Sequence, residues 1–227
     1  MSLEHKHSLR FWKRVKKADL PKQYDTQKIQ DLMTLVQKDA KTLGINNVSL
    51  AIEDKENAMY STSSGLGTPV PMQIPTIVTV GYPDIENLSL EELRSVMWHE
   101  LGHYIFPVYY PEIDEQYDKV VEQKDFYQKP KLHPAYYIVQ TFCDELAYKK
   151  FGKTYIVAFS KLERMENKEY RYKDDWERLF PMMDYVDKHG FGYWKQLAKE
   201  AGIEVKRVNR SSVPGVKPNL KILDGLV

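Results

Sequence analysis

The stretch SLEELRSVMWHELGH (residues 89–103) decides the fold that we expect, because it joins a helix start to a pair of histidines. Ser89 followed three residues later by Glu92 is a capping-box pattern, in which each side chain bonds the other residue's backbone N–H. Apolar residues then recur at helical spacing, and they are Leu90, Leu93, Val96, Met97, Leu101 and Tyr104. The stretch therefore predicts a helix, and we expect Pro107 to end it.

The two histidines of this helix form the pattern His-Glu-x-x-His. Residues four apart lie on one helix face, so the imidazoles of His99 and His103 can converge on one ion. Zinc binds such nitrogens, and Glu100 is placed beside the metal, where it can take a proton from the attacking water. Gly102 leaves room for a neighbouring element. The motif predicts one Zn²⁺ ion held by His99 and His103, with Glu100 as the catalytic base.

A catalytic zinc site also needs a third protein ligand and one open position. The segment from Ala135 to Phe151 is predicted as a helix, and two adjacent carboxylates, Asp144 and Glu145, interrupt its apolar pattern. A buried carboxylate needs a partner, which a metal ion would supply. Glu145 has the longer reach and ranks narrowly first, Asp144 lies nearer the apolar stripe, and His133 is a further candidate. The sequence alone does not decide among these three candidates for the third ligand.

The rest of the chain predicts a mixed fold. A helix begins at Asp25 or Thr26 and stops at Gly44, two antiparallel strands follow near residues 48–52 and 57–60, and Ile77–Val80 is a third strand. Residues 109–134 read as a linker, and further helices are expected near 155–165, 173–188 and 193–201. The prediction is an α+β fold in which a small, mostly antiparallel sheet packs on the His-Glu-x-x-His helix. Residues 1–22 form a basic segment, 23–152 the core, and 153–227 a helical C-terminal part with an extended tail.

Composition narrows the function classes. The formal net charge of +1 gives no broad field for holding nucleic acid, and no apolar run is long enough to span a bilayer. Cys143 is the single cysteine, so no internal disulfide is possible and metal ligands are expected from His, Asp and Glu. We expect a cytoplasmic protein whose partner is a peptide or protein substrate.

The order of these features resembles the gluzincin peptidases of the HtpX-like group and the related ImmA/IrrE-like proteases. The resemblance covers about residues 48–152, and its specific part is His99-Glu100-Leu101-Gly102-His103. It implies a zincin-like fold and a zinc-dependent endopeptidase whose edge strand, here Ile77–Val80, binds an extended peptide. The family's later motif is Glu-x-x-Ala-Asp. Aligning its Ala with Ala147 puts Asp144 at the ligand position, whereas counting to the small residue Gly152 selects Glu145.

The leading hypothesis is peptide-bond hydrolysis with Glu100 as general base. Donors for the developing oxyanion are suggested by residue type alone, and they are Tyr136, Tyr137, His189 and Tyr193. One alternative is a non-catalytic interaction or regulatory module with a structural zinc. Another is a latent protease whose tail, Val205 to Val227, covers the cleft.

Overall fold

The computed structural model describes residues 26–45, 48–53, 60–62, 76–121, 133–166 and 172–207. The predicted basic segment 1–22 and most of the predicted tail after Val205 lie outside these residues. The helices, in chain order, are α2 (Thr26–Thr42), α3 (Tyr82–Asn87), α4 (Leu90–Tyr109), α5 (Pro111–Val121), α6 (Pro134–Phe151), α7 (Lys153–Glu166), α8 (Tyr172–His189) and α9 (Tyr193–Glu200). The strands are β1 (Val48–Glu53), β2 (Tyr60–Thr62) and β3 (Thr76–Gly81).

The sheet has the order β1-β3-β2, with β1 parallel and β2 antiparallel to β3. The prediction of a mostly antiparallel sheet is therefore wrong, because six residue pairs join β1 to β3 and three join β2 to β3. The prediction that Ile77–Val80 is an edge strand is also wrong. Val78 and Val80 are fully buried, and a strand with such an apolar, β-branched sequence gains most in the centre of a sheet, between two partners.

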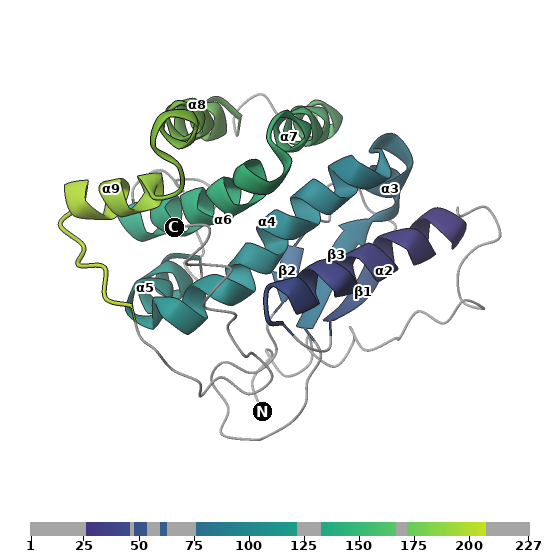
Figure 1. Cartoon of the computed structure of the whole chain (residues 1–227), viewed down its shortest axis with the longest axis horizontal. Helices are drawn as coiled ribbons and strands as arrows, with labels where there is room; N and C mark the ends of the chain where they lie inside the picture. Colours follow the sequence, from purple (N-terminus) through teal and green to yellow (C-terminus); the bar gives the residue numbers. More distant parts are fainter. Residues whose placement is uncertain are drawn as a thin grey trace, which may run out of the picture.

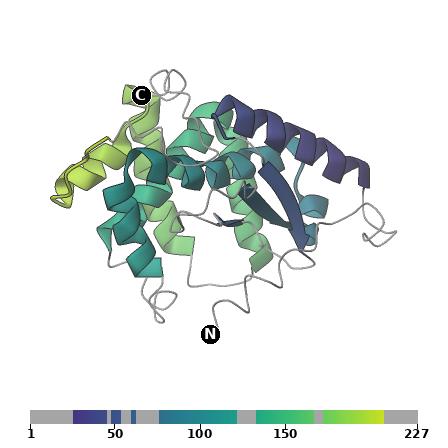
Figure 2. The same ribbon diagram turned by 90° about the horizontal axis from the view of Figure 1, so that it is seen from below.

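Helices α2 and α4 lie side by side against one face of this sheet (Figures 1 and 2). The predicted start and stop of α2 are confirmed, since Gly44 follows the helix with a φ of 79°, a conformation that favours glycine. Arg94 of α4 donates to both carboxylate oxygens of Asp39 of α2, at 2.6 and 2.8 Å. This two-pronged contact fixes the relative position of the two helices.

Helix α4 begins as predicted and ends later than predicted. Both bonds of the Ser89–Glu92 capping box are present. Pro107 lies inside the helix, which continues to Tyr109. Pro107 lacks the N–H that would bond the His103 carbonyl, and its ring crowds that carbonyl. The residues around it, including Phe106 and Val108, are nevertheless buried in the core. Packing therefore carries the helix past the proline.

The predicted linker 109–134 is partly wrong, because α5 occupies its first half. Tyr110 caps α4 and Pro111 opens α5, a position where the missing proline N–H costs nothing. Ile113 and Val120 of α5 are buried, which explains why a segment rich in acidic residues still folds as a helix. The predicted helix up to Gly152 is confirmed as α6.

The most extensive helix pairing joins α4 to α6, and α7, α8 and α9 also pack on α6. One buried apolar cluster runs from Ile29 to Ala198, so it includes residues of both the predicted core and the predicted C-terminal part. Among the described helices, none is long and apolar enough to cross a membrane.

Gly102 is where α4 and α6 come closest. A Cβ at this position would lie 2.9 Å from Sγ and 3.1 Å from Cα of Cys143. Glycine normally costs a helix about 1 kcal/mol relative to alanine, so its presence in the middle of α4 has a packing reason.

We expect Gly102→Ala to lower the free energy of unfolding by about 1–3 kcal/mol, because the added methyl group overpacks the α4–α6 contact. Urea unfolding of the variant, of Cys143→Ala and of the double variant tests this. The double variant should recover part of the loss, since removing Sγ relieves the closest contact. A single Gly102→Ala protein as stable as the wild type would contradict the packing account.

Candidate metal centre

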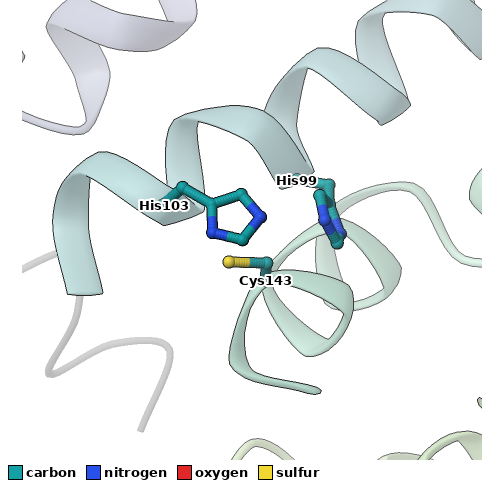
Figure 3. A group of neighbouring side chains, drawn as sticks. All are labelled: His99, His103 and Cys143. Atoms are coloured by element: carbon teal, nitrogen blue, oxygen red, sulfur yellow. The ribbon is translucent and has the colours of Figure 1, made fainter. Parts of the chain in front are cut away.

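The histidine pair of α4 meets a cysteine of α6. One ligand atom each of His99, His103 and Cys143 lies within 4.8 Å of the other two. Figure 3 shows both imidazoles on the same side of α4, with the Cys143 side chain of α6 beneath them. The helical spacing of the histidines and the close approach at Gly102 together produce this cluster. A thiol therefore lies among the candidate ligands, in addition to the His, Asp and Glu side chains that the sequence leads us to expect.

The environment keeps both imidazoles neutral. Burial and then the nearby Arg178 charge lower the pKa of His99 to about 3. Burial, His99 and Arg178 lower the pKa of His103 well below its ordinary value of 6.5. A neutral imidazole is the form that binds a metal ion. Near neutral pH the two side chains are therefore in the protonation state that a metal site requires.

Asp144 of α6 is fully buried and contacts the His99 imidazole of α4. Its Oδ1 lies 2.8 Å from Nδ1 of His99 and accepts a hydrogen bond from the Tyr155 hydroxyl at 2.5 Å. The Arg178 guanidinium contacts Oδ2 and offsets the carboxylate charge. A carboxylate on one ring nitrogen of a metal-binding histidine fixes its tautomer and orientation. The network leaves Nε2 of His99 for other partners.

Gln140 lies one helical turn before Asp144 and borders the same cluster. Its Nε2 donates a hydrogen bond to the Tyr117 hydroxyl at 3.3 Å. The Tyr117 ring of α5 stacks on His103 with centroids 6.0 Å apart. The two histidines are thus enclosed by α5 and α6 as well as by their own helix.

Glu145, the first-ranked third ligand, lies elsewhere. Its two oxygens accept hydrogen bonds from the backbone N–H groups of Gly192 and Trp194, both at 2.6 Å. These N–H groups are at the N-terminus of α9, which attracts negative charge. Asp144 and Glu145 are adjacent on α6 and therefore point in different directions, one toward α4 and the other toward α9. The structure brings Asp144 to the histidines and does not bring Glu145 there.

Other predicted residues are also placed. His133 is the N-cap of α6 and stands outside the cluster. Tyr136 stacks on Tyr117, whose ring also stacks on His103. Tyr137 packs edge-on against Tyr136. His189 and Tyr193 both pack on Tyr185 where α8 meets α9. Tyr136 and Tyr137 are therefore the predicted oxyanion donors that come nearest to the cluster.

Five residues of this centre were missed from the sequence, and they are Tyr117, Gln140, Cys143, Tyr155 and Arg178. Gln140 carried a usable signal, since it precedes Asp144 by four residues and must share its helix face. Tyr155 and Arg178 come from other helices, α7 and α8. No spacing along the chain connects them to the histidines.

Comparisons of the chain with protein-family models, with curated proteins and with solved structures find no match. What the centre can do is therefore argued from its own geometry.

The Glu145 contact predicts a pH dependence of stability. Burial raises the pKa of Glu145 from 4.5 to about 7, even though the α9 N–H groups oppose the shift. Between pH 4.5 and about 7 the folded chain therefore binds more protons than the unfolded chain. The contribution of Glu145 to the free energy of unfolding falls as the pH rises through this range and is constant above it. The expected decrease in the free energy of unfolding across this pH range is about 3 kcal/mol.

Glu145→Gln should remove this dependence and retain any bound metal, since the residue is not a ligand. Urea unfolding of both proteins from below pH 4.5 to above pH 7 measures it. Burial and Asp118 also raise the pKa of Asp114 to about 7, but this residue is common to both proteins and cancels in the difference. Parallel stability curves, or loss of metal from the variant, would contradict the assignment.

Proposed function

We propose that this chain is a zinc-dependent peptidase that hydrolyses peptide bonds with one Zn²⁺ ion and with Glu100 as general base. The observation that carries the proposal is the convergence of two neutral imidazoles, four residues apart on α4, with further donor groups of α6. His99 and His103 would hold the ion, and the third ligand would come from α6. A zinc ion at such a site polarises the scissile carbonyl and acidifies water.

The donor set fits zinc in kind as well as in spacing. Imidazole suits zinc, whereas magnesium and calcium prefer ligand sets made of oxygen. The Asp144 contact supplies the carboxylate that commonly supports a zinc-bound histidine. Arg178 keeps the net charge around that carboxylate low before any ion binds.

Glu100 is the residue to which we assign the proton transfer. It is 8% exposed and therefore lies at the edge of the core rather than in solvent. Burial and then the Glu100 charge raise the pKa of the Cys143 thiol, so the two side chains interact electrostatically. In the proposed reaction Glu100 takes a proton from the attacking water and then delivers it to the leaving amine.

The sheet offers a place for an extended substrate. With β3 in the centre, the edge strands of the described sheet are β1 and β2. Of these, β2 packs against α4, the helix that carries the motif. We propose that a peptide pairs with β2, since an unpaired strand edge binds extended chains through backbone hydrogen bonds.

Glu100→Gln tests the proposed function. We expect the variant to lose about 10²- to 10⁴-fold in the rate of peptide cleavage, the usual contribution of a general base. Its zinc content should stay equal to that of the wild type, because Glu100 is not a proposed ligand. Cleavage of a peptide library and metal analysis by mass spectrometry measure the two quantities.

Glu112→Gln is the matched control, since Glu112 is exposed on α5 and the same charge is removed. It should leave both cleavage and zinc content unchanged. Bound zinc without Glu100-dependent cleavage of any peptide would favour the non-catalytic module with a structural zinc.

A further inference from the structure

The face of α6 that meets α4 carries a thiol at the level of the two histidines. His99, Gly102 and His103 share one face of α4, because they are three and four residues apart. The Cys143 sulfur lies 2.9 Å from where a Cβ of Gly102 would stand. It therefore packs on α4 at a height between those of His99 and His103.

The separations within this group suit a single zinc ion. The ligand atoms of His99, His103 and Cys143 all lie within 4.8 Å of one another. Figure 3 shows the Cys143 side chain extending from α6 toward the imidazoles of α4. Zinc binds nitrogen at about 2.0–2.1 Å and thiolate sulfur at about 2.3 Å, so its tetrahedral ligands lie about 3.3–3.6 Å apart. Inward movements of about 1 Å or less by each side chain reach these separations.

Asp144 is the rival ligand on α6, and it already has other partners. Its Oδ1 contacts Nδ1 of His99 and accepts a hydrogen bond from the Tyr155 hydroxyl, and its Oδ2 contacts the Arg178 guanidinium. Turning this carboxylate toward a metal ion would give up these contacts and separate two buried opposite charges. A carboxylate on Nδ1 instead suits a partner that orients the imidazole while Nε2 binds the ion.

The cluster is closed on the α6 side and more open at His103. Cys143 has an exposure of 0%, whereas His103 is partly exposed. An ion bound to both and to His99 therefore keeps a direction toward solvent, which a catalytic zinc needs for its water. The free thiol is protonated, because burial raises its pKa well above the ordinary value, and coordination to a metal removes that proton.

We infer that the Cys143 thiolate is the third metal ligand, so that two histidines and one cysteine hold the ion. This inference rests on the proposed function, because it assumes that a metal binds to His99 and His103. Asp144 then orients His99, and Arg178 balances the charge of that carboxylate. A soft thiolate favours zinc, whereas magnesium and manganese prefer oxygen ligands, so the site selects zinc by ligand type.

Cobalt spectroscopy of the full chain tests the ligand without depending on a variant. The wild type loaded with Co²⁺ should show a thiolate-to-cobalt charge-transfer band in its near-ultraviolet spectrum. Cys143→Ser should abolish this band, because Cys143 is the single cysteine of the chain. Asp144→Asn should retain it, since the thiolate is still bound.

Zinc affinity, measured by competition with a chromophoric chelator, gives a second readout. Cys143→Ala should weaken zinc binding by at least about 100-fold, because one of three protein ligands is lost. Asp144→Asn should weaken it by about 10- to 100-fold, as loss of an orienting carboxylate does. Val139→Ala is the matched control, since Val139 is buried on the same helix and has no donor group. It should bind zinc as tightly as the wild type even though it is less stable.

Two results would overturn the inference: a cobalt-loaded wild type without the charge-transfer band, or unchanged zinc affinity in Cys143→Ala. In either case, bound zinc with Glu100-dependent peptide cleavage would still uphold the proposed function. A wild type that binds neither ion would end both proposals.

Discussion

The close contact between α4 and α6 at Gly102 is the constraint on which the rest of the centre depends. It brings one face of α6 within reach of His99 and His103, which a larger side chain at position 102 would prevent. The cost of a glycine inside a helix is about 1 kcal/mol. The contact places Cys143 in the interface, close to both histidines. The geometry of the site is thus a result of helix packing.

Buried charges then connect the C-terminal helices to the centre. Asp144 and Glu145 are fully buried, and each has a partner outside α6. Asp144 bonds Tyr155 of α7 and contacts Arg178 of α8, while Glu145 bonds the N-terminus of α9. Leaving either carboxylate without these partners would cost several kcal/mol. Helices α7 to α9 therefore contribute directly to the electrostatics around the histidines.

Much of the fold could be predicted from local patterns. Apolar spacing and end signals located α2, α4, α6 and the later helices, because these features depend on neighbours within a few residues. Strand order was not accessible, since the buried position of β3 between β1 and β2 is a long-range choice. The predicted end of α4 at Pro107 was wrong for a related reason. A proline removes one hydrogen bond locally, and whether the helix continues depends on the packing of the residues beyond it.

The sequence by itself determined the motif, because His99, Glu100 and His103 are related by helical geometry alone. It also determined that α6 carries donors suitable for a metal ion. Only the tertiary structure decided which of them faces the histidines, since neighbours on a helix are rotated by about 100° and two adjacent carboxylates must point to different helices. Tyr155 and Arg178 also belong to the centre only through tertiary structure. Folding brings them into contact with Asp144, and no spacing pattern in the sequence predicts these contacts.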